Sequence, residues 1–424
     1  MNSAITKLYR LKVFSLILFI LTYSLLYTTT LFAQSPNTWT QKASFPGVPR
    51  VSTVSFTIGS KVYIGTGQDS SSNLLSDFWE YDPAVNAWTQ LADFTGSARR
   101  GAVGFVIGLK GYIGTGFDGT ANLLDFYEYN PSINNWNQKK KLGNPTSLPR
   151  RDASAFTIGN QGYVVGGYDG TITWNKECWA YDGDTTWLKK GDLGNGGSAQ
   201  SIARRWAVSF TIDTLGYVGC GYNYSQDWRK DFWRYNTITN AWTQMANFGG
   251  TPRSNALAFA INGKGYAGTG NDNDFNNDFW EFDPVNNTWM QVADYAGGAI
   301  IGGIGVSING KGYAGLGRDS IAYRNDFWEY TPDSLIGVNG PADQNLSVNV
   351  FPNPCGEMLY IKSTKYEVQS IVIRNTIGEI VYIPQLLKCK GDYIVINTSS
   401  LSHGIYFLVL NSGERKVVKK FMKK

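Results

Sequence analysis

The stretch KVYIGTG at Lys61–Gly67 decides the fold, because close copies of it return five more times along the 424-residue chain. The later copies are KGYIGTG (110–116), QGYVVGG (161–167), LGYVGCG (215–221), KGYAGTG (264–270) and KGYAGLG (311–317). The tyrosines of successive copies are 47 to 54 residues apart. A period of about 50 residues with four short apolar runs per unit indicates a repeated all-β unit.

Each unit predicts four strands. In the first unit, VSTVSFTIG (51–59) is the innermost strand and KVYIGTG is the second. DFWEYDP (77–83) predicts a third strand through its alternation, and NAWTQ (86–90) predicts the outer edge strand. The glycines of the second strand leave room for close approach of neighbouring backbones.

The sixth unit ends at DFWEYTP (326–332) and lacks an outer strand. The missing strand matches NTWTQ at 37–41, which occurs once, ahead of the first complete unit. If this segment pairs with the last unit, the ring closes without an unpaired sheet edge. We therefore expect six blades, the sixth of which is built from both ends of the repeat region.

Residues 37–332 resemble the kelch-repeat six-bladed β-propellers in the Gly-Tyr block, the third-strand aromatics and the outer Trp. The resemblance implies an all-β fold and places a propeller at 34–332. It does not imply a function, because propellers include both binding proteins and enzymes.

The N-terminus has the pattern of a secretory signal. Lys7, Arg10 and Lys12 precede an apolar run, and a small residue, Ala33, follows it. We expect residues 1–33 to be a signal peptide cleaved between Ala33 and Gln34. A retained membrane anchor is the alternative, since the run is nearly long enough to span a bilayer.

Residues 346–424 abandon the repeat and predict a small β-sandwich after a linker at 333–345. FPNP (351–354), Gly378, LSHGIY (401–406) and the basic end with Lys419 and Lys420 resemble the C-terminal sorting domain of the type IX secretion system of Bacteroidetes-type bacteria. That resemblance implies export to the cell surface or release, with the secretion machinery as a partner. An ordinary accessory β-sandwich is the alternative.

Charge and histidine content exclude several functions. Residues 34–336 carry 24 basic and 27 acidic groups, which argues against a broad nucleic-acid surface. The single histidine, His403, lies in the C-terminal segment. The absence of histidine from the propeller argues against a copper oxidase of the kelch type, which needs two histidines on the metal. The same count excludes a Ser-His-Asp triad and a histidine-based zinc site, and no cofactor is expected. The loop NDNDFNND (271–278) is a poor calcium loop, because it lacks the Gly and Glu of an EF-hand. The four cysteines have no metal-type spacing, and we expect buried thiols; one oxidised pair is the alternative in an exported protein.

Arginines precede the inner strands and are the main site candidates. One arginine stands thirteen residues before the anchor tyrosine in five units: Arg50, Arg99, Arg150, Arg204 and Arg253. These side chains could encircle the channel mouth, or they could be structural and pair with the loop acids Asp69, Asp118, Asp169, Asp272 and Asp319. Three consecutive units add a second arginine, Arg100, Arg151 or Arg205, and these asymmetric residues are the better candidates for binding a carboxylate.

Three tryptophans fall outside the repeat: Trp174, Trp206 and Trp228. They predict either a sugar-stacking or protein-docking surface beside the arginines, or packing between long loops.

We expect a secreted or surface-attached protein that binds an anionic protein or glycan ligand. The alternative is a metal-free carbohydrate enzyme such as a sialic-acid mutarotase or epimerase, for which Asp152 is the nearest acid.

Overall fold

The structure is a computed structural model, and it describes residues 37–170, 174–194, 202–223, 225, 227–332, 348–363, 370–375, 379–382, 388–390, 393–412 and 415–424. The predicted signal peptide, with Ala33 and Gln34, and the predicted linker at 333–345 lie outside the described residues.

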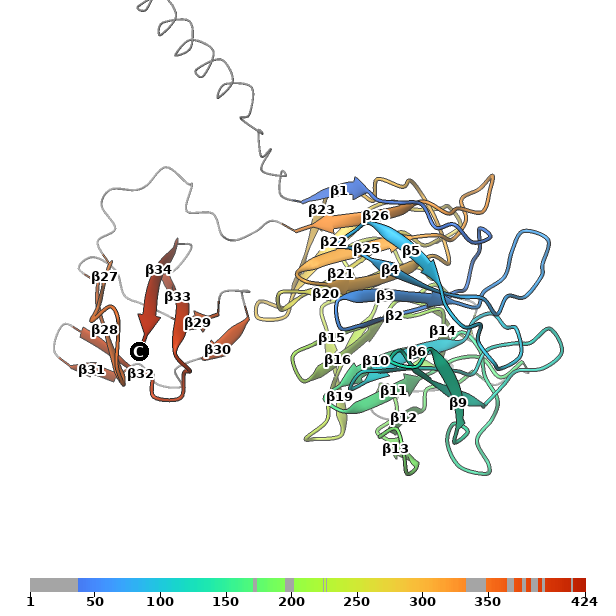
Figure 1. Cartoon of the computed structure of the whole chain (residues 1–424), viewed down its shortest axis with the longest axis horizontal. Coiled ribbons are helices and arrows are strands. Elements are labelled where there is room, and N and C mark those ends of the chain that lie inside the picture. Colours follow the sequence, from blue (N-terminus) through green and yellow to red (C-terminus); the bar gives the residue numbers. More distant parts are fainter. Residues whose placement is uncertain are drawn as a thin grey trace, which may run out of the picture. The chain divides into compact units, whose positions relative to one another are not determined.

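Residues 37–332 form six four-stranded antiparallel sheets arranged as propeller blades (Figure 1). Blade one comprises β2 (Val54–Ile58), β3 (Lys61–Gly65), β4 (Phe78–Asp82) and β5 (Ala87–Gln90). Blade two comprises β6 (Val103–Ile107), β7 (Lys110–Gly114), β8 (Phe126–Asn130) and β9 (Asn135–Lys139). Blade three comprises β10 (Ser154–Ile158), β11 (Gln161–Val165), β12 (Cys178–Tyr181) and β13 (Trp187–Lys190).

The remaining blades follow the same plan. Blade four comprises β15 (Val208–Ile212), β16 (Leu215–Gly219), β18 (Phe232–Asn236) and β19 (Ala241–Met245). Blade five comprises β20 (Leu257–Ile261), β21 (Lys264–Gly268), β22 (Phe279–Asp283) and β23 (Thr288–Val292). Blade six comprises β24 (Ile304–Ile308), β25 (Lys311–Gly315), β26 (Phe327–Thr331) and β1 (Thr38–Gln41). A short extra pair, β14 (Arg204–Arg205) and β17 (Tyr222–Asn223), precedes and follows the first two strands of blade four.

The N-terminal strand β1 pairs with β26 and supplies the outer strand of blade six. Trp39 lies opposite Tyr330 in this pair, as Trp88 lies opposite Tyr81 in blade one. The Trp39 indole donates a hydrogen bond to the Ala293 carbonyl of blade five (3.1 Å). Each of the other outer tryptophans makes the equivalent bond to the chain of the preceding blade, so β1 occupies a regular place in the ring.

The Gly-Tyr motif follows from contact between blades. A Cβ at Gly111 would lie 2.4 Å from the Phe56 ring of blade one, and a Cβ at Gly162 would lie 2.1 Å from Phe105 of blade two. These distances are shorter than any carbon contact, so the glycine lets the preceding inner strand pack directly on the backbone. The neighbouring tyrosines and phenylalanines are buried and stack, as Phe156 does on Tyr163 (centroids 5.2 Å apart).

The described residues between 348 and 424 form two further four-stranded sheets. One sheet contains β27 (Val348–Phe351), β28 (Met358–Ser363), β32 (Tyr393–Asn397) and β31 (Lys388–Lys390). The other contains β30 (Ile380–Tyr382), β29 (Ser370–Arg374), β33 (Gly404–Ser412) and β34 (Arg415–Lys423). Leu359 and Ile396 of the first sheet share one buried core with Ile373 and Phe421 of the second, so the two sheets pack against each other. Among the described residues, no helix is long and apolar enough to cross a membrane.

Candidate functional site

The first arginine of each unit belongs to the scaffold. The five side chains, hereafter the buried arginines, are at most 1% exposed: Arg50, Arg99, Arg150, Arg204 and Arg253. Each binds the acid immediately before the third strand, and the pairs are Arg50–Asp77, Arg99–Asp125, Arg150–Glu177, Arg204–Asp231 and Arg253–Asp278. The prediction that these guanidinium groups encircle the channel mouth does not fit this burial.

The predicted partners of the buried arginines were wrong. Asp69 accepts hydrogen bonds from the backbone N–H groups of its own loop, at Ser71 (2.9 Å) and Asn73 (2.8 Å). Asp118 and Asp319 cap their loops in the same way. The backbone N–H groups of a short loop satisfy these carboxylates locally. The acid before the third strand lies beside the buried guanidinium instead, and that guanidinium needs a counter-charge because it is removed from water.

Blade one shows how completely a buried arginine is satisfied. Arg50 Nη1 and Nη2 each lie 2.6 Å from an oxygen of Asp77, and Nη1 also donates to the Thr66 carbonyl (3.1 Å). Its guanidinium carbon lies 4.9 Å from the Phe45 ring centroid. The Trp79 indole donates to the same carboxylate (2.7 Å). Burial raises the pKa of Asp77, but the hydrogen bonds and charge of Arg50 outweigh burial and hold that pKa below its usual value.

Blade six keeps the acid although it lacks the arginine. Ile300 replaces the arginine and is 1% exposed. Arg324, just ahead of the third strand, lies 3.2 Å through Nε from Asp326 Oδ1. The Trp328 indole donates to the same carboxylate (2.6 Å). The acid before the third strand is therefore paired with an arginine in every blade.

A closed ring of backbone hydrogen bonds ties the blades together just before the inner strands. Its six members are Ser52, Gly101, Asp152, Trp206, Asn255 and Gly302. Each N–H donates to the carbonyl of the equivalent residue in the preceding blade at 2.8–3.1 Å, and Ser52 closes the ring on Gly302. All six have φ between 54° and 64°, a left-handed conformation that costs most residues energy.

The second arginine of blades two, three and four immediately precedes a ring member. Arg100, Arg151 and Arg205, hereafter the arc arginines, alternate with aromatic rings. Phe117 lies 5.5 Å from the Arg100 guanidinium carbon and 4.8 Å from that of Arg151. Tyr168 lies 5.0 Å from that of Arg151 and 4.9 Å from that of Arg205. The three predicted site arginines are therefore brought together in one run over three consecutive blades.

The arc arginines differ from the buried arginines in their hydrogen bonds. Arg151 Nη1 donates to Asn122 Oδ1 (3.1 Å). The side chains of Arg100 and Arg205 make no hydrogen bond to another residue that the structure describes, and Arg205 Nε is buried without a partner. Buried polar groups in folded proteins are normally hydrogen-bonded. Arg205 Nε departs from this rule, and the partly exposed Arg100 guanidinium adds donors without a described partner. Together they are the strongest sign of a ligand site in the described chain.

The three tryptophans outside the repeat gather at the blade-four end of the arc. Tyr222 lies at their centre, with ring centroids 5.7 Å from Trp174, 6.4 Å from Trp206 and 5.4 Å from Trp228. The Arg205 guanidinium carbon lies 3.7 Å from the Trp206 centroid and 4.9 Å from that of Trp174. We call Trp174, Trp206, Tyr222 and Trp228 the aromatic cluster; all four are partly exposed.

Asp152 is the acid of the site. Its side chain is 7% exposed, and Oδ2 lies 3.5 Å from Arg151 Nε. A Cβ at Gly101 would lie 2.2 Å from Asp152 Oδ1, so the carboxylate fits only because glycine precedes it in the ring. Burial raises the pKa of Asp152 above its usual value, although the charges of Arg151, Arg205 and Arg100 and a hydrogen bond from Trp206 oppose that rise.

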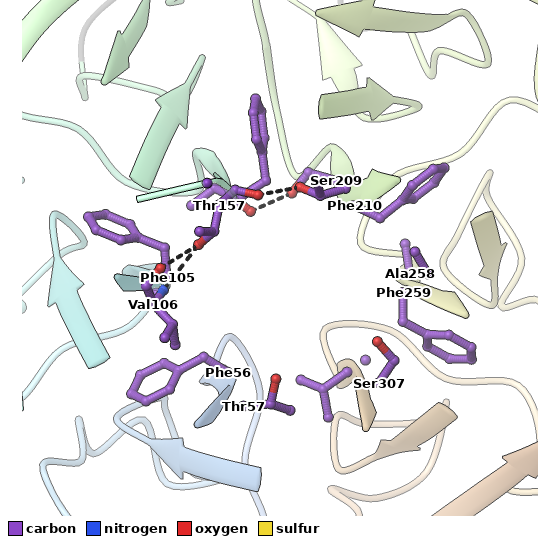
Figure 2. A pocket seen from close by; sticks show the side chains of 18 of the residues that line it. Phe56, Thr57, Phe105, Val106, Thr157, Ser209, Phe210, Ala258, Phe259 and Ser307 are labelled. Carbon is purple, nitrogen blue, oxygen red and sulfur yellow. Dashed lines mark hydrogen bonds between the residues drawn. The ribbon is translucent and has the colours of Figure 1, made fainter. Parts of the chain in front are cut away.

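The central channel lies between the inner strands and is distinct in chemistry from the arc. Figure 2 shows that Thr57, Val106, Thr157, Ser209, Ala258 and Ser307 line it, while Phe56, Phe105, Phe210 and Phe259 point away into the blades. The cavity measures about 520 Å³ and has no charged side chain in its lining. Its lining includes Gly108, Gly159 and Asn160 in turns that follow the inner strands, whereas the arc arginines precede those strands. The hydroxyls are partly engaged with neighbouring blades, as in the bond from Thr211 Oγ1 to the Thr157 carbonyl (2.8 Å).

The described residues contain no group of three or more His, Cys, Asp or Glu side chains that could hold a metal ion. In the loop that resembled a calcium site, Asn276 Nδ2 donates to Asp272 Oδ1 (3.0 Å).

Cys178, Cys220 and Cys355 are buried free thiols, as the sequence predicted. The Cys389 side chain lies outside the described part.

Phe117, Tyr168 and Tyr222 were missed at the sequence level. Each follows the last glycine of the second strand in the three units that carry a second arginine. The equivalent residues elsewhere are Gln68, Asn271 and Arg318. The sequence did contain a signal for these rings, because an aromatic residue at this position and a second arginine occur in the same three units.

Comparisons with known proteins agree with this architecture. Residues 23–210 match the family model described as the KLHDC2/KLHL20/DRC7 Kelch-repeats domain, and residues 349–424 match the Secretion system C-terminal sorting domain. A solved structure titled "Structure of YjhT" aligns at 15% identity with a TM-score of 0.59, over 69% of this chain and 98% of that chain. At this identity the alignment shows the fold alone. A search of curated proteins finds no match.

The sorting domain indicates export to the cell surface or secretion. Together with the six blades and the two family matches, it identifies the chain as a kelch-repeat β-propeller protein with a C-terminal sorting domain of the type IX secretion system.

Proposed function

We propose that this exported propeller is a binding protein whose ligand is anionic and docks on the arc arginines. The observation that supports the proposal is the pair of unused guanidinium groups, Arg100 and Arg205, on either side of Arg151. A guanidinium offers a planar fork of donors that matches a carboxylate, sulfate or phosphate. The asymmetry of the site agrees with ligand binding, because a purely structural role would repeat in every blade.

The proposal is tested by binding of the full chain to an array of acidic and neutral glycans and peptides. The wild type is compared with a triple Arg100→Gln, Arg151→Gln, Arg205→Gln variant. A charge-assisted hydrogen bond contributes about 1.5–3 kcal/mol, so loss of even one should weaken binding about tenfold or more. Arg318→Gln is the matched control, because Arg318 also lies over a ring (Phe275, 5.4 Å) but belongs to blade six. Equal binding by the wild type and the triple variant would refute the proposal.

A metal-free carbohydrate enzyme is the second candidate function, and Asp152 favours it. A buried carboxyl with a raised pKa beside three arginines can exchange a proton with a bound acidic sugar nearer neutral pH than an ordinary carboxyl can. Interconversion of the anomers of N-acetylneuraminate, followed by NMR with wild type and Asp152→Asn, tests this. If the wild type accelerates the interconversion and Asp152→Asn does not, the result supports an enzyme. If the interconversion proceeds at its spontaneous rate with both proteins, the protein is a binding protein and not this enzyme.

A further inference from the structure

The arc arginines and the rings between them form a ladder in the order Arg100, Phe117, Arg151, Tyr168, Arg205. Each ring–guanidinium distance is between 4.8 and 5.5 Å. A guanidinium that lies over a ring keeps its N–H groups in its own plane, at the edge of the stack. The ladder therefore presents donors along its edge and has little free ring face between Arg100 and Arg205.

The charges of the ladder form a row. Arg100 and Arg151 share Phe117, so their guanidinium carbons lie no more than about 10 Å apart, and Arg151 and Arg205 share Tyr168 in the same way. Three consecutive blades supply the three cations. A small monoanion satisfies one or two members of such a row, whereas a linear ligand with repeated negative groups can satisfy all three.

The aromatic cluster extends the row at the blade-four end. Its rings are tilted against Tyr222 by 44° (Trp174), 42° (Trp206) and 63° (Trp228), so they do not cover one another face to face. Arg205 lies over Trp206 and Trp174, so Trp228 is the indole of the cluster that is best placed to meet a sugar. An indole face suits the C–H face of a sugar ring, because the negative π surface attracts the slightly positive hydrogens. A ligand on this surface combines negative groups at one end with a flat apolar face at the other.

The rest of the ring of blades has different side chains at the same positions. Val51, Ser254 and Ile301 replace the arc arginines in blades one, five and six. Gln68 and Asn271 replace the ladder aromatics in blades one and five. In blade six the ladder position is Arg318, a single cation over Phe275. These three blades therefore offer amide and hydroxyl groups to sugar hydroxyls and one isolated cation, which cannot form a second row. The ligand is therefore directed along blades two to four.

We propose that the arc binds a linear acidic oligosaccharide, with carboxylates of successive sugars along the arc arginines and an uncharged ring face on the aromatic cluster. This inference rests on the proposed function and names its ligand class. An acidic peptide would satisfy the arginines but would leave the indole faces without a flat partner, so the sugar uses more of the surface.

The experiment measures binding of the full chain to three probe series by titration calorimetry. These are oligogalacturonides from the monomer to chains longer than the arc, maltooligosaccharides of the same lengths, and poly-L-glutamate of matching charge. We expect the affinity for oligogalacturonides to rise about tenfold for each further carboxylate that reaches an arginine, and then to level off. The neutral sugars should not bind measurably, and poly-L-glutamate should bind at least tenfold more weakly than the longest galacturonide.

Two variants test the two ends of the site separately. Arg100→Gln should lower the affinity for long oligogalacturonides but leave the affinity for the monomer unchanged. Trp228→Ala should lower the affinity for the oligogalacturonides but leave the affinity for poly-L-glutamate unchanged. An affinity that does not depend on chain length, or a stronger affinity for poly-L-glutamate, would overturn the inference while the proposed function stands. The proposed function fails on its own test, equal binding of the array by the wild type and the triple arginine variant. The chain-length series on the wild type decides the matter even if a variant does not fold.

Discussion

Arg204 and Arg205 are neighbours in the sequence and lie in the same short strand, but their surroundings are opposite. Arg204 is 1% exposed, binds both oxygens of Asp231 at 3.1 and 2.7 Å, and donates to two carbonyls. Arg205 lies among Tyr168, Trp174 and Trp206 and has a buried Nε without a partner. The strand places one side chain inside the blade and the other towards the aromatic cluster, so one residue serves the fold and the other is available for a ligand.

The comparison extends to the two sets of arginines. The buried arginines recur in five blades, each with its own acid, and the sixth blade supplies Arg324 instead. The arc arginines occur in three blades and share one acid, Asp152. A cation that meets its counter-ion in every repeat is a scaffold element, and three cations around one carboxylate leave an excess of positive charge.

The largest expected effect is on stability. Asp231→Ala removes the counter-ion of Arg204 and leaves a buried cation without a partner, which should cost about 3–5 kcal/mol in the free energy of unfolding. Urea unfolding measures this cost. The matched control is Asp184→Ala, because Asp184 is 87% exposed and pairs with Lys139 at 3.4 Å on the surface. That change should cost about 0–1 kcal/mol, and similar costs for both would show that the buried pair is not special.

The next effect concerns the backbone ring. Gly101→Ala places a methyl group at φ 61° and against Asp152 Oδ1, and should cost about 1–3 kcal/mol of unfolding free energy. Gly108→Ala isolates the conformational part, because Gly108 has φ 60° with no atom within 4 Å of the added Cβ. We expect the control to cost about 1 kcal/mol. If Gly101→Ala costs no more than the control, the contact with Asp152 has no energetic role.

A smaller effect tests the planar geometry of the arc. Arg205→Lys keeps the charge but replaces a flat guanidinium, which lies over the Trp206 ring, with a compact ammonium. We expect the affinity for an acidic oligosaccharide to fall about tenfold, while the unfolding free energy changes little. Full affinity in this variant would mean that charge alone attracts the ligand.

The smallest effect is the pH dependence of binding. Because the pKa of Asp152 is raised, its carboxyl is protonated at a higher pH than an ordinary carboxyl as the pH falls from neutral. Protonation removes the negative charge that lies beside the arc arginines. Affinity for dextran sulfate, whose charge is fixed, should therefore rise severalfold as the pH falls through that pKa, at constant ionic strength. In Asp152→Asn the affinity should be high and nearly independent of pH. An identical pH profile in both proteins would exclude Asp152 as the source.

The fold could be predicted from the sequence because each blade repeats one pattern. The spacing of the Gly-Tyr blocks and of the outer tryptophans reflects contacts that recur around the ring, such as Gly111 on Phe56, whose equivalents occur in blades two to six. The partners of the buried arginines were missed although the sequence held a signal for them. An acid equivalent to Asp77 accompanies the arginine in all five units, whereas unit four has Asn223 at the position of Asp69. The three-dimensional positions then show that Asp69 caps its loop and Asp77 is the counter-ion.

The candidate site could be predicted in part. The arc arginines and the three tryptophans stood out because they break the repeat, and the structure brings them together. The ladder rings Phe117 and Tyr168 did not stand out, because an aromatic after the second strand resembles the many core aromatics of this chain. The backbone ring at Ser52 and Trp206 was not predictable, since nothing in these side chains favours a left-handed conformation.

The most direct test of the account measures two quantities on the pair Arg204→Gln and Arg205→Gln. Urea unfolding and calorimetric binding of an acidic oligosaccharide are determined for both variants and the wild type. The account predicts that Arg204→Gln loses several kcal/mol of stability, while the Arg205→Gln protein keeps its stability and loses about tenfold or more in affinity. Wild-type affinity in Arg205→Gln, or an equal loss of stability in both variants, would contradict it.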